Sequence, residues 1–367
     1  MRGRGTGRPS AGAPGKSART LVPPGMVRMA PTMVVPSLLR EYDVDPVPLI
    51  AEFGLTLAHF DEPERLLPYE GRSRLLVRCA EATRCPHFGL LVGQHSGLSS
   101  FGLVGFLVQS APTFRAGLDL VLRYFQLHNP NATIGFLEEH GFARFSHTIL
   151  RPDFAGREHV VDMSAAIMFN ALRMLCGQGA QPVEVRLARG RPADTVPYLR
   201  FFQAPLVFNA SDTGLIVPAA WLDRPVPTAD PLLHLMMRER AAELLSQAGD
   251  DVVSRLRRQL PSLLAARTAS VAAVSQGLGI PVRTLNRRLA ERGTSFAALR
   301  DEARHAMARQ LLRGTAMPVS EIAVHLGYAH ATAFTSAFRR WSGQGPSKWR
   351  DAKGRAASRR AGRGGRK

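Results

Sequence analysis

Cysteine is scarce in this chain, and its distribution argues against two kinds of site. The 367 residues include three cysteines, Cys79, Cys85 and Cys176. Their number is odd and no two of them form a C-x-x-C pair, so neither a disulfide framework nor a zinc site is expected. A glycine-rich phosphate loop and an H-E-x-x-H motif are also missing. We therefore expect no metal, no cofactor and no catalysis.

Long apolar runs are absent as well. No stretch reaches the ~18 uncharged residues that a membrane span needs. Residues 1–25 are basic, but they lack the continuous apolar core and small-residue cleavage site of a secretion signal. The sequence therefore predicts a cytoplasmic protein that does not contact membranes.

Acidic residues are missing where the basic residues concentrate. Residues 1–33 contain six Lys/Arg and no acid, and residues 351–367 contain seven Lys/Arg and one acid. Of the total net charge of +19, residues 251–350 supply +11, whereas residues 34–250 carry −4. This asymmetry favours one domain that contacts a polyanion such as nucleic acid, next to one that does not.

Chain length and composition predict five segments. A chain of this length exceeds what one hydrophobic core usually supports. Residues 1–33 are rich in Gly, Pro and Arg and predict a disordered basic leader, in which Met26, Met29 and Met33 are alternative starts. An effector or oligomerisation domain is expected at 34–235, a helical linker at 236–262, a second domain at 263–350 and a disordered basic tail at 351–367.

The middle domain shows mixed helical and extended patterns, so we expect an α+β fold. Apolar residues at spacings of three and four predict helices over 113–128 and 162–176. Residues 133–137 and 142–149 flank a Glu-Glu-His-Gly turn and predict a hairpin. Residues 183–187 and 215–217 are further strand candidates.

The predicted linker and the residues just before it are rich in apolar side chains. Packing within the protein is the favoured interpretation, and a dimerisation stripe is the alternative. These side chains are Leu232, Leu233, Leu235, Met236, Leu244 and Leu245.

An internal repeat dominates the C-terminal part. In the first copy, a helix ends at Gly279 and a second helix carries Leu285 and Leu289; in the second copy, Gly327 precedes a helix with Phe334 and Phe338. A sharp turn between two helices requires a positive φ, which glycine adopts without steric cost. Residues 295–312 supply a connecting helix with Ser295 as its N-cap. The sequence therefore predicts an all-α domain with two tandem helix-turn-helix units.

These motifs resemble the DNA-binding region of the AraC/XylS family. The resemblance covers roughly 265–350 and rests on GIPVRTLNRRLAERGTSF (279–296), ARQLL and EIAVHLGYAHATAFTSAFRRWSGQGPSKWR (321–350). The upstream domain more weakly resembles the effector domain of the ornithine-utilisation and VirS-like branch. The resemblance implies promoter DNA, RNA polymerase and a small-molecule effector as partners, a homodimer as a further option, and transcription activation as the outcome.

The second helix of the first unit, 282–290, has side chains suited to reading bases. With Leu285 and Leu289 inward, Arg283, Asn286 and Arg287 face outward. Arginine can bridge guanine O6 and N7, and asparagine can bridge adenine N6 and N7. Pro281 stands where the family usually has a capping serine, so about 1 kcal/mol of capping energy is missing.

The second unit is predicted to read bases less strictly. Its helix turns Thr332, Thr335 and Ser336 outward, and Ser336 stands where the family commonly has arginine. Hydroxyl groups discriminate bases weakly, so this unit is expected to position the protein on the backbone. The expected phosphate contacts are Arg288, Arg339, Arg340 and Lys348.

Two other functions remain as alternatives. Cys85-Pro86-His87, with His95 nearby, suggests a nucleophile of the kind used by one group of DNA-repair methyltransferases, although the Pro-Cys-His-Arg order of that group is absent. The basic tails suggest a sequence-blind, nucleoid-associated DNA binder, against which the outward Arg283, Asn286 and Arg287 argue.

Overall fold

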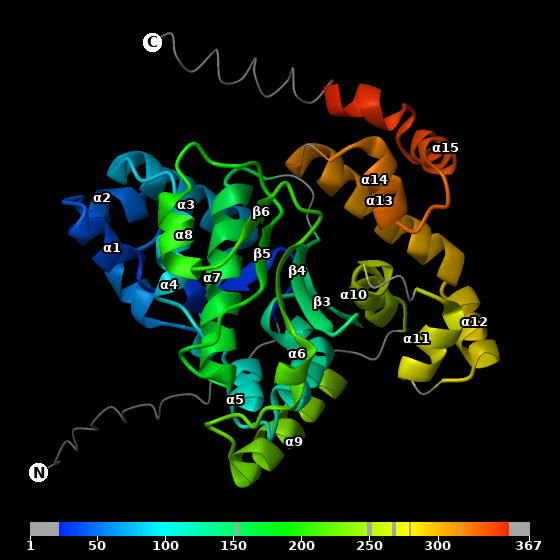
Figure 1. Cartoon of the computed structure of the whole chain (residues 1–367), viewed down its shortest axis with the longest axis horizontal. Coiled ribbons are helices and arrows are strands. Elements are labelled where there is room, and N and C mark those ends of the chain that lie inside the picture. The colour runs from blue at the N-terminus through cyan, green and yellow to red at the C-terminus, as the bar shows by residue number, and fades with distance from the viewer. Residues whose placement is uncertain are drawn as a thin grey trace, which may run out of the picture.

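Two large clusters of buried apolar side chains divide the chain. The computed structural model describes residues 22–150, 154–247, 252–265, 269–278, 280–315 and 317–351. One cluster collects side chains between Val27 and Leu244, and the other collects side chains between Val252 and Trp349. The chain therefore has two domains, a mixed α/β domain followed by an all-helical one (Figure 1).

A five-stranded sheet organises the N-terminal domain, in the order β3-β4-β7-β5-β6. Its β5–β6 pair is parallel and its other pairs are antiparallel. The predicted hairpin is present as β3 and β4, with Ala132 opposite Ile149, and His140 and Gly141 make the turn with φ of 52° and 79°. The strands are β3 (Ala132–Glu139), β4 (Phe142–Ile149), β5 (Glu184–Leu187), β6 (Leu206–Phe208) and β7 (Thr213–Pro218).

The ordered domain begins earlier than expected. Strand β1 (Met26–Arg28) pairs with β2 (Leu66–Pro68), and Val27 and Met29 are buried. The prediction of disorder for residues 1–33 is therefore wrong for residues 22–33, whereas residues 1–21 lie outside the described residues. Composition could not show this, because the backbone groups of β1 find their hydrogen-bond partners in β2, about 40 residues further along the chain.

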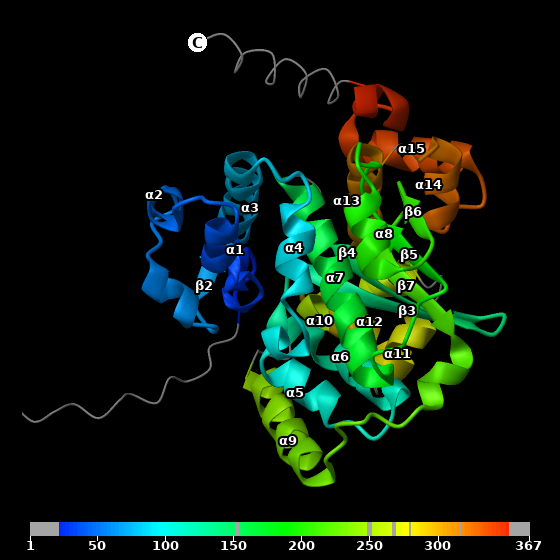
Figure 2. The ribbon, with the colours of Figure 1, turned by 60° about the vertical axis from the view of Figure 1, so that its left-hand side comes forward.

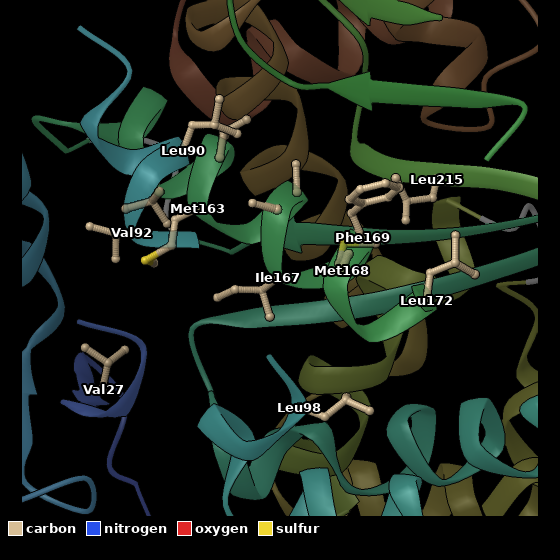
Figure 3. Close-up of a cluster of buried hydrophobic side chains, with 14 of the residues drawn as sticks. Val27, Leu90, Val92, Leu98, Met163, Ile167, Met168, Phe169, Leu172 and Leu215 are labelled. Carbon is tan, nitrogen blue, oxygen red and sulfur yellow. The ribbon is translucent and has the colours of Figure 1, made fainter. Parts of the chain in front are cut away.

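Helices surround the sheet, and α7 lies against it (Figures 1 and 2). Figure 3 shows the apolar side chains of α7 with Leu215 of β7. Helix α7 begins at Arg157, five residues before the predicted start, after Gly156 with a φ of 79°. The helices are α1 (Val35–Glu41), α2 (Pro46–Ala51), α3 (Tyr69–Thr83), α4 (Phe88–Gln94), α5 (Leu103–Gln109), α6 (Phe114–His128), α7 (Arg157–Cys176) and α8 (Val196–Phe202), with 3-10 turns at Ala30–Thr32, Leu57–Asp61, Leu98–Phe101 and Ala219–Asp223.

Two glycines let α4 approach α7 closely. A Cβ atom at Gly89 would lie 2.3 Å from the carbonyl oxygen of His159, and one at Gly93 would lie 2.6 Å from that of Met163. Carbon and oxygen cannot approach so closely without displacing a backbone, so a side chain at either position would push the helices apart. The spacing G-x-x-x-G places both glycines on one helix face.

The segment predicted as a linker divides between the two domains. Helix α9 (Pro231–Gln247) packs on α5 and α6 and buries Leu244, whereas α10 (Val252–Ala265) supplies Leu256 and Leu260 to the C-terminal core. Packing explains only part of the apolar pattern, because Leu232, Leu235 and Met236 are 69%, 55% and 55% exposed.

The C-terminal domain contains two helix pairs joined by one long helix. The pairs are α11 (Val271–Leu278) with α12 (Val282–Glu291) and α14 (Val319–His325) with α15 (Ala331–Ser342), and α13 (Phe296–Gly314) connects them (Figures 1 and 2). The Ser295 side chain accepts a hydrogen bond from the Ala298 amide at 3.1 Å, so the predicted cap of α13 is confirmed. Among the described residues, no helix is long and apolar enough to span a membrane.

Candidate nucleic-acid interface and internal cavity

Helix α12 presents the three side chains that the sequence assigns to base reading. Leu285 and Leu289 are fully buried against α10 and α11. On the other side of the helix, Arg283, Asn286 and Arg287 are exposed, as the spacing predicts, and Arg288 is exposed as well. Two buried leucines four residues apart thus fix which face of α12 meets solvent.

Arg287 makes only a long, exposed ion pair. Its Nε lies 3.7 Å from Oε1 of Glu291, and the two side chains are 71% and 62% exposed. An exposed pair at this distance contributes little free energy, so the guanidinium can leave it for a better acceptor. Among the described residues, no side chain caps the start of α12 at Pro281, in agreement with the sequence.

Helix α15 is anchored by aromatic rings. Phe334 and Phe338 are fully buried with their centroids 5.7 Å apart, and Phe338 also lies 5.7 Å from Trp349 and 5.8 Å from His305. The opposite face exposes Thr332, Ser336 and Arg339, while Thr335 is half-buried. Arg340 is exposed but pairs with Asp301 of α13 at 3.0 Å.

The turn between α14 and α15 depends on one glycine and one arginine. Gly327 has a φ of 76°, as predicted, whereas Gly279 lies outside the described residues. Arg304 of α13 donates from Nε to the carbonyl oxygen of Leu326 at 3.0 Å, and its guanidinium lies 4.7 Å from the centre of the Tyr328 ring. Sequence reasoning missed Arg304, because nothing in the local pattern indicates a contact 22 residues along the chain.

The end of the domain is fixed in a similar way. Trp349 is buried, with the Arg313 guanidinium 4.5 Å from its ring centroid. Arg350 donates from Nε to the carbonyl oxygen of Leu312 at 3.2 Å. These contacts hold the segment against α13, and Lys348 within it is exposed.

The cysteine that suggests an enzyme is not set up as a nucleophile. Cys85 is buried, and burial raises the pKa of its thiol and lowers the pKa of His87. A reactive cysteine requires a thiolate favoured by a nearby positive charge. Among the described residues, no cluster of three or more His, Cys, Asp or Glu side chains could hold a metal.

The N-terminal domain contains a cavity of about 90 Å³ that the sequence did not reveal. Most of its wall is apolar and comes from α5, α6, α7 and the β3–β4 hairpin. Leu98, Met163, Ile167, Met168 and Leu172, all labelled in Figure 3, belong to this wall. Its polar lining includes Arg72, His128, Asn129 and His147. A mostly apolar cavity with a few polar groups is typical of a small-molecule site.

The two domains meet close to this cavity. Helix α10 contacts β3, and Gln310 of α13 is buried. With its amide oriented to satisfy both neighbours, Gln310 donates to the carbonyl oxygen of Ile149 and accepts from Nη2 of Arg157 at 3.0 Å. Arg157 is the first residue of α7, and α7 also lines the cavity. The helix that lines the cavity therefore also contacts α13 of the C-terminal domain.

Comparisons with known proteins match both domains. The model of the arabinose-binding domain of AraC transcription regulators, N-terminal, matches residues 44–226, and a helix-turn-helix domain model matches residues 274–352. The ornithine utilization regulator of Pseudomonas aeruginosa is 28% identical over 322 residues, 83% of this chain and 93% of that protein. The regulator VirS of Mycobacterium tuberculosis is 27% identical over 319 residues, 85% and 93% of the two chains.

The crystal structure of the transcriptional regulator CdpR from Pseudomonas aeruginosa matches 72% of this chain and 86% of that chain at 27% identity, with a TM-score of 0.37. The two family models together cover the five-stranded sheet and most of both helix pairs. This chain belongs to the AraC/XylS family of DNA-binding transcription regulators.

Proposed function

We propose that this regulator is a sequence-specific, effector-responsive activator in which α12 reads bases and α15 mainly anchors the protein. The supporting observation is the exposed trio Arg283, Asn286 and Arg287 on a helix whose other face is buried. Their donor patterns suit guanine and adenine edges in the major groove, whereas Thr332 and Ser336 discriminate weakly. Arg288, Arg339, Arg340 and Lys348 are assigned to phosphates.

Two such helices on one chain suit two successive major-groove segments, about 34 Å apart on one face of the duplex. A monomer could therefore bind, and dimerisation through the N-terminal domain would increase avidity. The protein would then act on RNA polymerase at the promoter, within the nucleoid, and we assign no catalytic role to it.

Arg287→Ala is expected to weaken binding to the preferred site by about 1–3 kcal/mol and to relax the preference at one base pair. Arg339→Ala, on α15, is the matched control and should weaken all sequences about equally, because a phosphate contact carries no sequence information. Affinities of both variants for the selected site, for single-base changes of it and for random DNA, at one fixed salt concentration, provide the measurement. If the two variants lose affinity in the same pattern, the separation of reading from anchoring is wrong.

The contact between the domains supports the proposal that the effector domain influences DNA binding. Gln310→Ala is expected to lower the free energy of unfolding by about 1–3 kcal/mol, because it leaves a buried Arg157 amino group and the Ile149 carbonyl without a partner. Glu302→Ala on the same helix is the control, since its pair with Arg257 is exposed and should contribute less than about 1 kcal/mol. Equal losses in urea unfolding of the two variants would contradict the assigned contact.

A further inference from the structure

The polar wall of the cavity is unusual in carrying a buried positive charge without a counter-ion. Arg72 of α3 is 5% exposed, and among the described residues no carboxylate pairs with its guanidinium and no group accepts a hydrogen bond from its Nε. Its guanidinium lies 5.4 Å from the centroid of the Tyr69 ring, which is a weak substitute for an anion. A buried charge without a partner is strongly unfavourable, so a ligand that supplies an anionic partner for Arg72 would bind favourably at this wall.

Two histidines extend this polar wall. His128, at the end of α6, and His147, on β4, are both buried and line the cavity together with Arg72. The Nδ1 atom of each ring has no hydrogen-bond partner among the described residues. Arg157, the domain-contact residue, is also buried, and its charge acts on His147. Burial lowers the pKa of both histidines and so favours their neutral form, whereas an anion bound beside the rings would favour the protonated form.

Apart from Asn129 and Ser164, most of the remaining wall is apolar. Phe101, Phe125, Ile134 and Met168 are among the side chains that face the space. A cavity of about 90 Å³ has room for a chain or ring of roughly six to nine carbon-sized groups, since a single water requires only about 10–15 Å³ by the same measure. The wall thus combines one cationic end with a long apolar remainder.

We infer that the cavity binds an organic anion with an apolar body and a single anionic head group, held at Arg72 with His128 and His147. This inference rests on the proposed role of the N-terminal domain as effector domain and specifies the chemistry of the effector. A guanidinium can form two parallel hydrogen bonds to a carboxylate, which would supply the missing counter-ion. Binding there would also place negative charge beside His147 and Arg157, close to the contact with Gln310 of α13.

Thermal shift and calorimetry on the full-length chain, at pH 7 and without DNA, test the inference with four probes of equal chain length. Octanoate and octyl sulfate are expected to bind and to raise the melting temperature, whereas octanol and octylammonium are not. The two anions distinguish a carboxylate-specific head-group site from one that accepts any compact anion, and binding of either supports the inference. Equal binding of all four probes, binding of only octanol or octylammonium, or binding of none would overturn it.

Variants locate the head group. Arg72→Gln is expected to weaken octanoate binding about 10- to 100-fold, the usual effect of one charged hydrogen bond. Arg72→Lys keeps the charge but cannot form two parallel hydrogen bonds, so it is expected to lose less affinity than Arg72→Gln. Arg123→Gln, an exposed arginine on α6 outside the lining, is the matched control and should bind as the wild type does. Unchanged octanoate affinity in a folded Arg72→Gln chain would overturn the assignment.

Stability without ligand gives a readout that does not depend on the probes. If Arg72 stabilises the fold, Arg72→Gln should lower the melting temperature of the ligand-free protein. If Arg72 serves to bind a ligand, the same substitution should leave the melting temperature unchanged or raise it, because it removes a buried charge without a partner. A lowered melting temperature in both Arg72→Gln and Arg72→Lys would contradict the site. If octanoate binds at Arg72 but leaves DNA affinity unchanged, the anion site stands and the proposed effector role fails.

Discussion

Replacing Phe338 with alanine is expected to lower the free energy of unfolding of the C-terminal domain by about 3–5 kcal/mol. The ring is fully buried and contacts Phe334 on its own helix, His305 on α13 and Trp349 at the end of the domain. Its removal would leave a cavity where these three elements meet. Guanidinium unfolding followed by tryptophan fluorescence would measure the change, because Trp341 and Trp349 both lie in this domain.

The loss should extend to DNA binding. Without the ring, α15 is no longer held against α13, and the exposed Arg339 and Arg340 lose their fixed direction. Val324→Ala is the control, because this side chain on α14 is 49% exposed and its removal should change stability by less than about 0.5 kcal/mol. A Phe338→Ala chain as stable as Val324→Ala would show that the aromatic cluster does not anchor α15.

Acidification is expected to destabilise the ligand-free N-terminal domain through His147. Burial, together with the nearby Arg72 and Arg157, lowers the pKa of His147 from 6.5 to about 4. A group whose pKa is lower in the folded than in the unfolded chain stabilises the fold above its unfolded pKa, and this contribution disappears as the pH falls towards the folded value. The contribution of His147 is about 3 kcal/mol, and most of it is lost between pH 6.5 and 4.

The measurement is a comparison of the wild type with His147→Gln, not the wild-type curve alone. Burial raises the pKa of Asp162 to about 6, which makes that carboxyl change stability in the opposite direction over the same pH range. Because Asp162 is present in both chains, its effect cancels in the difference. On acidification to pH 4, the free energy of unfolding of His147→Gln should fall by about 3 kcal/mol less than that of the wild type. If the free energies of the two chains fall in parallel with pH, the burial of a neutral His147 is contradicted.

The periodicity of the sequence predicted the DNA-binding domain well, because its signals are local. Leucines or phenylalanines four residues apart define the inner face of α12 and α15, and the remaining positions follow from helix geometry. Local signals also located the β3–β4 hairpin, from two extended segments that flank a Glu-Glu-His-Gly turn. Helix caps and the positive φ of Gly327 also depend on a few neighbouring residues.

Long-range contacts account for what the sequence did not reveal. The order of residues 22–33 depends on pairing with β2, and the position of the α14–α15 turn depends on Arg304 from another helix. The cavity brings Arg72, His128 and His147 together from three separate elements, so no spacing in the chain indicates it. The predicted linker at 236–262 contains the end of α9 and most of α10, which join different cores, because apolar residues at helical spacing do not show which core a helix joins.

The central claim is that α12 and α15 enter two successive major grooves from one chain. Methylation interference at guanine N7, on a site selected by the full-length protein from a random DNA pool, tests this claim most directly. The account predicts two clusters of interfering guanines about one helical turn apart on the same face, with the stronger cluster under α12 and with interference at one guanine of that cluster reduced in Arg287→Ala. A single cluster, or selection that yields no common site, would contradict it.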